Sequence, residues 1–206
     1  MLRSRFNARR PSVLLGLAIA SASLMSSARA ASPHSLPLAD NVDLGRMYGG
    51  WYIVATIPNA FERGMVGPYD VYSPGPHGTI TEDFYVRRGG FGAPLRRFKV
   101  RDFVRPGTNN ARWGVQIIWP LKLPFLVLYT DPQYRYVLFG EDDRKLGWIY
   151  SRSPMISDDD YQMLLERFAS LGYDPSQFRR IVQAPEQIGR PGFWSDGVRR
   201  VAAPAR

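Results

Sequence analysis

Short runs rich in Tyr, Phe, Val, Ile and Trp alternate with turns marked by Gly, Pro, Asp and Asn between residues 50 and 152. Runs of this composition predict β-strands, and the short turns allow neighbouring strands to pair antiparallel. Eight such strands close into a barrel, which leaves no unpaired sheet edge. The sequence therefore predicts an all-β, up-and-down barrel, with strands at 50–57, 68–73, 79–87, 95–104, 112–119, 124–130, 134–140 and 146–152.

One helix is predicted after the last strand. Ser157 precedes three aspartates and stands at capping-box spacing from Asp160, which is typical of a helix N-terminus. Gly172 predicts its end. Apolar side chains share one face between these points, at Tyr161, Leu164, Leu165, Phe168 and Leu171. A helix with a single apolar face packs on another element, so we expect it on the outside of the barrel, followed by a short strand at 178–183.

Residues 1–30 are typical of a signal peptide, with a basic start, a short apolar core at 13–20 and Ala28-Arg29-Ala30 as the cleavage site. The apolar run is too short to cross a bilayer, which takes about 20 residues. The formal charge of +9 includes five arginines in this segment and no acid, so +4 remains without it. Because both signs are interspersed, this charge indicates no nucleic-acid partner. Export by the twin-arginine route stays open because of Arg9-Arg10.

The sequence contains no cysteine. An exported product would therefore lack disulfides and the thiol on which a bacterial lipoprotein anchor is built. We expect a soluble periplasmic or secreted protein, with outer-membrane association as an alternative. Residues 31–41 predict an extended lead-in, 42–183 one domain, and 184–206 a disordered tail rich in Pro, Gly and Arg. Peripheral contact of this basic tail with anionic lipid is a further alternative.

Two motifs about 100 residues apart indicate how the barrel closes. Trp51 lies at the start of the first strand and Arg152 follows the last, and a guanidinium over an indole face contributes about 0.5–2 kcal/mol. With the turn between them, these motifs resemble the three signatures of the lipocalin family, in particular its bacterial outer-membrane and apolipoprotein D-like branch. The matching residues are Gly49, Trp51 and Tyr52, then Thr130, Asp131 and Tyr134, then Arg152.

The resemblance covers residues 42–183 and implies an eight-stranded barrel with a C-terminal helix on its outside. It also implies that the signature residues hold the closed end of the barrel together rather than contact a ligand. Inward side chains recur at every second strand position. We take Trp51 as inward in the first strand and the basic face of 95–104 as turned to solvent. The alternation then predicts a cavity lined by Ile53, Ala55, Phe98, Val100, Val115, Ile117, Tyr136 and Trp148. The register of 79–87 stays open, because both of its faces carry apolar and acidic residues.

Candidate catalytic groups are few. The two histidines, His34 and His77, lie in the lead-in and in a Pro-Gly turn, and the aspartates at 142–143 and 158–160 fit a turn and a helix cap better than a metal site. We expect no cofactor and no metal. The resemblance implies a non-enzymatic protein that carries or stores a fatty acid, lysophospholipid or similar lipid. The alternative is a lipocalin-like enzyme, such as an isomerase, acting on a lipid or pigment, and a perturbed carboxylate deep in the cavity would favour it. An integral outer-membrane barrel fits less well, because a capped helix follows the last strand.

Overall fold

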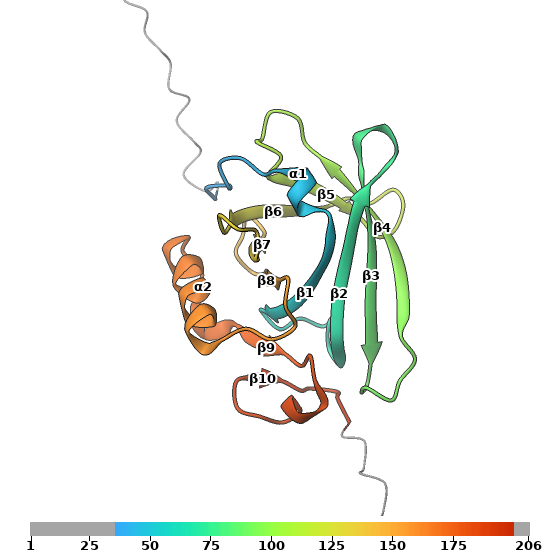
Figure 1. Cartoon of the computed structure of the whole chain (residues 1–206), viewed down its shortest axis with the longest axis vertical. Coiled ribbons are helices and arrows are strands. Elements are labelled where there is room, and N and C mark those ends of the chain that lie inside the picture. Colours follow the sequence, from blue (N-terminus) through green and yellow to red (C-terminus); the bar gives the residue numbers. More distant parts are fainter. Residues whose placement is uncertain (1–35, 200–206) are drawn as a thin grey trace, which may run out of the picture. The chain divides into compact units, whose positions relative to one another are not determined.

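The computed structural model describes residues 36–199, and the predicted signal peptide lies outside the described residues. The barrel strands are β1 (Gly49–Thr56), β2 (Met65–Pro74), β3 (Ile80–Arg88), β4 (Arg96–Val104), β5 (Arg112–Gln116), β6 (Leu123–Thr130), β7 (Tyr136–Gly140) and β8 (Gly147–Ser151). Each pairs antiparallel with the next, and β8 pairs back onto β1, from Tyr52 opposite Ser151 to Thr56 opposite Trp148 (Figure 1). The predicted closed barrel of eight antiparallel strands is confirmed.

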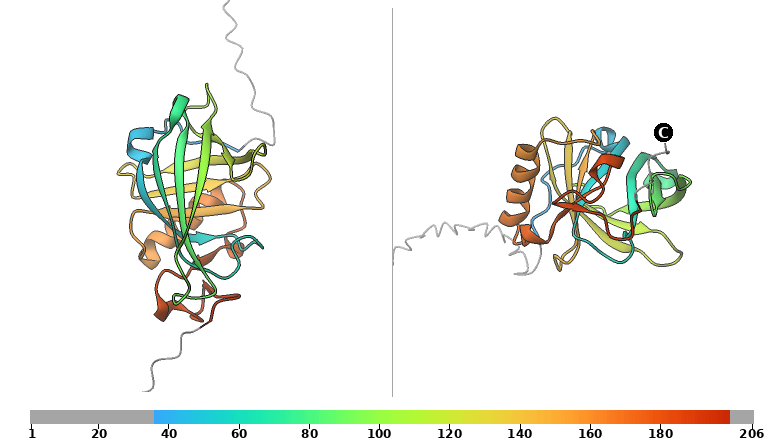
Figure 2. Two further views of the ribbon diagram at one scale, coloured as in Figure 1. Left: turned by 90° about the vertical axis from the view of Figure 1, so that its right-hand side faces the viewer. Right: turned by 90° about the horizontal axis from the view of Figure 1, so that it is seen from below.

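The predicted helix is α2, Asp158–Ser170. The Ser157 hydroxyl accepts a hydrogen bond from the Asp160 backbone N–H at 3.0 Å, which caps the first turn as the sequence predicts. Its apolar face buries Leu164, Leu165 and Phe168 against the outer surface of β6, β7 and β8. Figure 2 shows the helix lying along the outside of these strands. The barrel wall on this side is therefore buried on both faces.

The remaining helical segments are single turns. They are α1 (Leu44–Met47) and three 3₁₀ helices, η1 (Pro76–Gly78), η2 (Pro175–Gln177) and η3 (Pro185–Gln187). The strand expected at 178–183 is present as β9 (Arg179–Ile181), which pairs with β1 at Ala55 and Thr56.

The C-terminal segment differs from the prediction. Residues 184–199 were expected to belong to a disordered tail, but β10 (Phe193–Trp194) pairs parallel with β9, after η3. The physical reason is that apolar side chains in the segment, Ile188, Phe193 and Val198, pack on Val66 and Val182. A segment that buries apolar surface can offset its ordering entropy, so the prediction is wrong for 184–199. Residues 200–206 lie outside the described part of the chain.

The end of the barrel beside α1 is closed by the signature residues. The Arg152 guanidinium lies 3.7 Å from the centre of the Trp51 ring and donates to the Gly50 and Tyr48 carbonyls at 2.7 and 3.0 Å. The Trp51 indole N–H donates to the Met47 carbonyl at 2.7 Å. Gly49 has a φ of +95°, and a Cβ there would lie 3.3 Å from the Arg152 guanidinium. These contacts join the start of β1 and the chain just after β8 to α1.

The second signature lies in the turn between β6 and β7. The Asp131 carboxylate accepts from the Tyr136 backbone N–H at 2.9 Å, and the Tyr134 hydroxyl accepts from the Asp43 backbone N–H at 2.7 Å. Thr130 pairs with Val137 at the end of the ladder. These bonds join the turn to the N-terminal part of the domain and to β7, and the structural role that the resemblance implies for these residues stays a prediction.

Candidate ligand-binding site

A cavity of about 290 Å³ lies inside the barrel, at the end away from α1. It is bordered by the β1–β2 loop and by the β3, β4, β5 and β8 ends that face this loop. The lining residues are Ile53, Phe61, Glu62, Met65, Asp70, Glu82, Phe84, Arg88, Phe98, Val100, Val115, Ile117, Phe125, Trp148 and Tyr150. Most of this wall is apolar, so the cavity suits the hydrocarbon part of a small ligand.

Aromatic rings make up one side of the cavity. Phe125 stacks on Phe139 with ring centres 4.3 Å apart, and its centre lies 5.1 Å from that of Trp148. Across the sheet, Phe84 and Phe98 lie 6.1 Å apart. Rings at these separations hold one another in place, which gives the apolar wall a defined shape.

Six of the eight predicted cavity residues line this space. They are Ile53, Phe98, Val100, Val115, Ile117 and Trp148. Their contact with a ligand stays a prediction. Ala55 and Tyr136 do not line the cavity, so the prediction is wrong for these two.

Ala55 lies on the opposite face because β1 contains a bulge between Ile53 and Ala55, where its register with β8 shifts. One extra residue reverses the facing of every later side chain. Ala55 therefore packs under α2, while Thr56 bonds to Glu62 beside the cavity. Tyr136 also lies under α2, where its hydroxyl donates to the Asp160 carboxylate at 3.0 Å.

The alternation left three acidic residues unnoticed. Asp70, Glu82 and Asp102 come from the adjacent strands β2, β3 and β4, and their exposed fractions are 1%, 8% and 0%. We call them the carboxyl trio. Glu82 stands opposite Tyr72 and Asp102 opposite Ile80, so the three carboxyls are diagonal neighbours on the inner face. Asp70 and Glu82 line the cavity, and Asp102 lies beside it.

The trio is poorly satisfied. The carboxyl oxygens of Asp70 and Asp102 accept no well-formed hydrogen bond from any described residue, and no ion pair within residues 36–199 includes a member of the trio. Burial raises the pKa of Asp70 to about 7, although the Tyr150 hydroxyl nearby favours the charged form. Burial also raises the pKa of Asp102 to about 7 and that of Glu82 well above its usual range. Near neutral pH the trio therefore retains protons that exposed carboxyls would lose.

The mouth of the cavity is braced by a fourth acid. The Glu62 carboxylate accepts from the Trp148 indole N–H at 2.6 Å, from Asn59 at 2.8 Å and from Thr56 at 2.9 Å. Burial raises its pKa, against these three bonds. The Arg88 guanidinium donates to the Phe61 carbonyl at 2.9 Å and to the Arg63 carbonyl at 2.7 Å. These bonds hold the β1–β2 loop at the opening.

The sequence did contain a signal for the trio. The alternation that turns Phe98 and Val100 inward also turns Asp102 inward, and Glu82 shares a face with Phe84. No comparable signal marks Glu62, because its loop contacts the cavity only through the tertiary fold.

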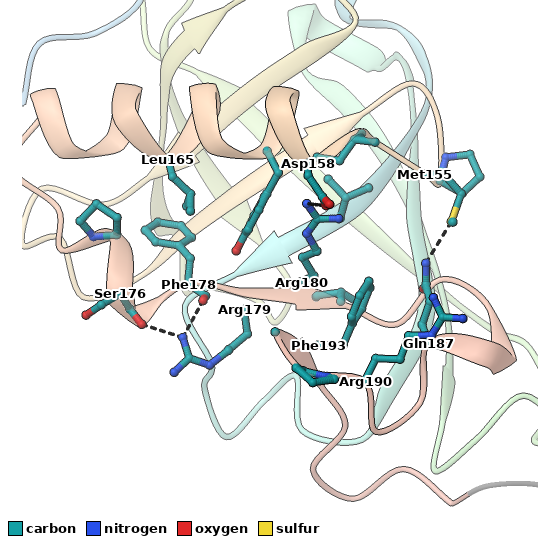
Figure 3. A pocket seen from close by; sticks show the side chains of 18 residues that line it. Met155, Asp158, Leu165, Ser176, Phe178, Arg179, Arg180, Gln187, Arg190 and Phe193 are labelled. Carbon is teal, nitrogen blue, oxygen red and sulfur yellow. Dashed lines mark hydrogen bonds and ion pairs between the residues drawn. The ribbon is translucent and has the colours of Figure 1, made fainter.

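A second pocket, of about 700 Å³, lies outside the barrel between α2, β9 and the C-terminal segment (Figure 3). Several of its polar side chains bond to the protein. Arg180 pairs with Asp158 at 2.6 Å, Arg179 donates to the Ser176 carbonyl at 2.6 Å, and Gln187 contacts a methionine sulfur. The barrel cavity, with its unsatisfied carboxyls, is therefore the better candidate for a ligand site.

Two further observations bear on the chemistry. Among residues 36–199 there is no group of three or more His, Asp or Glu side chains placed to hold a metal ion. In the same part of the chain, no helix has the length and apolarity needed to cross a bilayer.

Comparison with known proteins places this architecture. A family model described as "Lipocalin-like domain" matches residues 42–183. "Temperature-induced lipocalin-1" of Arabidopsis thaliana is 27% identical over 77% of this chain and 92% of its own. "Outer membrane lipoprotein Blc" of Escherichia coli K12 is 28% identical over 71% of this chain and 82% of its own.

Solved structures show the same fold. Apocrustacyanin C2 superposes with a TM-score of 0.56 at 14% identity, covering 75% of this chain and 93% of its own. Insecticyanin from the tobacco hornworm Manduca sexta gives a TM-score of 0.55 at 18% identity, covering 71% and 82%. With the closed barrel, the outer helix and the family match over most of its length, this chain belongs to the lipocalin family.

Proposed function

We propose that the protein binds a small hydrophobic ligand in the barrel cavity and carries or stores it. The apolar, aromatic wall inside a closed barrel is the observation that supports this most directly. A volume of about 290 Å³ lies at the lower end of ligand pockets, so a single hydrocarbon chain fits better than a bulky ring system. At about 0.8 kcal/mol per buried methylene, eight would contribute roughly 6 kcal/mol, part of which is lost to association entropy. Since about 6 kcal/mol corresponds to a Kd of roughly 40 μM, we expect a chain held by its methylenes alone to bind in the range of tens of micromolar or weaker.

A fatty acid, a lysophospholipid or a similar amphiphile would satisfy these limits. We further propose that the protein is exported and works in the periplasm or outside the cell, in keeping with the signal-like residues 1–30. One relative is named an outer membrane lipoprotein, whereas this sequence has no cysteine to carry a lipid anchor. We thus propose a soluble carrier, for which contact with the outer membrane would be peripheral.

Native mass spectrometry of the protein, before and after addition of single-chain lipids, tests the carrier function. Val100→Phe should weaken binding at least tenfold, because Val100 lines the cavity and a larger ring would fill it. Tyr136→Phe is the matched control, since Tyr136 lies on the outer face of the barrel under α2. Failure of every single-chain lipid to bind, or equal binding to Val100→Phe, would contradict the proposal.

The carboxyl trio supports a second candidate function, an enzyme acting on a lipid or pigment. Carboxyls whose pKa lies near 7 can exchange protons with a substrate at neutral pH. Mass spectrometry of lipids and pigments recovered after incubation distinguishes the two functions. A carrier returns its ligand unchanged, whereas an enzyme returns an isomer or other product that does not form with Asp70→Asn.

A further inference from the structure

The barrel cavity has an apolar wall and one acidic side, the carboxyl trio. We propose that the trio binds the cationic amine of a single-chain amphiphile, with the hydrocarbon tail extending along the apolar wall toward the mouth. This inference rests on the proposed function and narrows its ligand class, since among single-chain amphiphiles it favours an amine over the fatty acid named there.

The first argument is that two members of the trio lack hydrogen-bond partners. Asp70 and Asp102 are almost fully buried, and their carboxyl oxygens accept no well-formed hydrogen bond within residues 36–199. Buried acids normally have a counter-charge or a set of donors, because leaving them unpaired costs roughly 1–3 kcal/mol or more. Arg88, the one basic side chain among the described residues that line the cavity, donates to two loop carbonyls at the mouth. The missing partner would therefore come from a ligand.

The second argument concerns the kind of cation. The described residues offer no group of three His, Asp or Glu side chains arranged around a metal position. An ammonium group is less demanding, because its three N–H donors can point to acceptors on different strands. Asp70 and Glu82 reach the cavity directly, and the Asp102 carboxyl beside Glu82 adds to the negative potential. A carboxylate headgroup would meet like charge at the same place, which disfavours it.

The third argument is the form of the mouth. Phe61 and Ile117 border the cavity with exposed fractions of 85% and 59%, and Phe98 is also exposed. A headgroup held by the trio would place the far end of its tail beside these side chains. Part of their exposed apolar surface would then be covered by the ligand.

The proposal makes binding depend on pH. A protonated amine favours the charged form of the trio, so binding releases protons near neutral pH. Titratable groups that face the trio are the Tyr72 and Tyr150 hydroxyls and, from the loop, Glu62. Burial raises the pKa of both tyrosines well above 10, so they stay neutral in this range. Affinity for an amine should therefore rise between pH 6 and pH 8.

The test compares three ligands that share one chain: octylamine, octanol and octanoate. Isothermal titration calorimetry of the full protein should give octylamine at least tenfold tighter binding than octanol, and octanoate the weakest. Asp70→Asn and Glu82→Gln should bring the amine-to-alcohol ratio close to one. Asp83→Asn is the matched control. Asp83 lies next to Glu82 in β3 but on the opposite face of the sheet, where it pairs with Arg97 at 2.6 Å. It should keep the ratio of the unaltered protein.

A measurement on the unaltered protein guards against variants that do not fold. Titrations at pH 7 in two buffers of different ionisation enthalpy should show proton release with octylamine and none with octanol. Equal affinities for amine and alcohol, or no proton release with the amine, would overturn the inference and leave the carrier function standing. If neither these three ligands nor any single-chain lipid of the carrier test binds, the carrier function itself fails.

Discussion

Replacing Asp70 with Asn should change how the stability of the protein depends on pH. Asp70 is 1% exposed, and its pKa rises from 3.8 to about 7 on folding because burial disfavours the charged form. The folded protein therefore keeps a proton that the unfolded chain loses above about pH 4. By linkage, this group stabilises the fold least at high pH, and its contribution declines as pH rises from about 4 through 7.

The magnitude follows from the size of the shift. At about 1.4 kcal/mol per pKa unit, the contribution of Asp70 to the free energy of unfolding falls by about 2.5 kcal/mol between pH 5 and pH 8. In Asp70→Asn this fall is absent, so the stability of the variant should decline less over that range. With a urea m-value of about 2 kcal/mol/M, the urea midpoint of the unaltered protein should fall by roughly 1 M more than that of Asp70→Asn between pH 5 and pH 8.

Urea unfolding followed by tryptophan fluorescence at several pH values between 5 and 8 provides the assay. The slope with pH is the readout, since any fixed penalty for the new amide shifts all points equally. Asp83→Asn is the control. Arg97 lowers the pKa of Asp83, so the stability from this pair is lost only below about pH 4. An identical slope for Asp70→Asn and the unaltered protein would refute the reasoning, because the trio would then be ionised and well solvated in the fold.

Three further changes test the packing of the barrel away from the cavity. Arg152→Met should lower the free energy of unfolding by about 2–4 kcal/mol in urea titrations, because it removes carbonyl bonds and the contact with Trp51; an unchanged midpoint would contradict the closing role. Tyr136→Phe should lose only about 0.5–1.5 kcal/mol, for one bond to Asp160, with unchanged ligand affinity in calorimetry. Gly140→Ala should reduce the free energy of unfolding by about 1–3 kcal/mol or more and so lower the melting temperature, since its Cβ would lie 2.1 Å from the Tyr173 hydroxyl oxygen. An unchanged melting temperature would show that Tyr173 can move away.

The unmatched trio bears on the balance between stability and binding. Three buried acids without a counter-charge reduce the stability of the empty barrel, and an amine would relieve that penalty on binding. Replacing the acids should therefore stabilise the empty protein at pH 8 while it weakens the preference for a cation. In the same variant, the free energy of unfolding at pH 8 should therefore rise while the amine-to-alcohol affinity ratio falls.

Local sequence patterns sufficed for the strands and the helix. Period-two runs between Gly and Pro turns predicted all eight barrel strands to within a few residues at most ends, because strand formation and turn chemistry are properties of short segments. Ser157 and Asp160 predicted the start of α2 for the same reason. Trp51 and Arg152 needed the family resemblance, since nothing local joins two residues so far apart.

The identity of the cavity wall was decided by the tertiary structure. The bulge after Ile53 reversed the facing of Ala55, and α2 buried the outer face of β7, so apolar character no longer distinguished its two sides at Tyr136. Residues 184–199 became ordered because Val66 and Val182 offer an apolar surface that composition alone does not show.

The carboxyl trio shows the same division. Asp102 lies on the inward face that alternation assigned to Phe98 and Val100, whereas alternation left the facing of Glu82 open, because both faces of its strand carry apolar and acidic residues. Their meeting depends on the register between β2, β3 and β4, and register is a property of paired strands. The sequence by itself determined a lipocalin barrel closed by Trp51 and Arg152. Only the packed structure decided that its cavity has an acidic side, because burial and proximity arise when the strands are brought together.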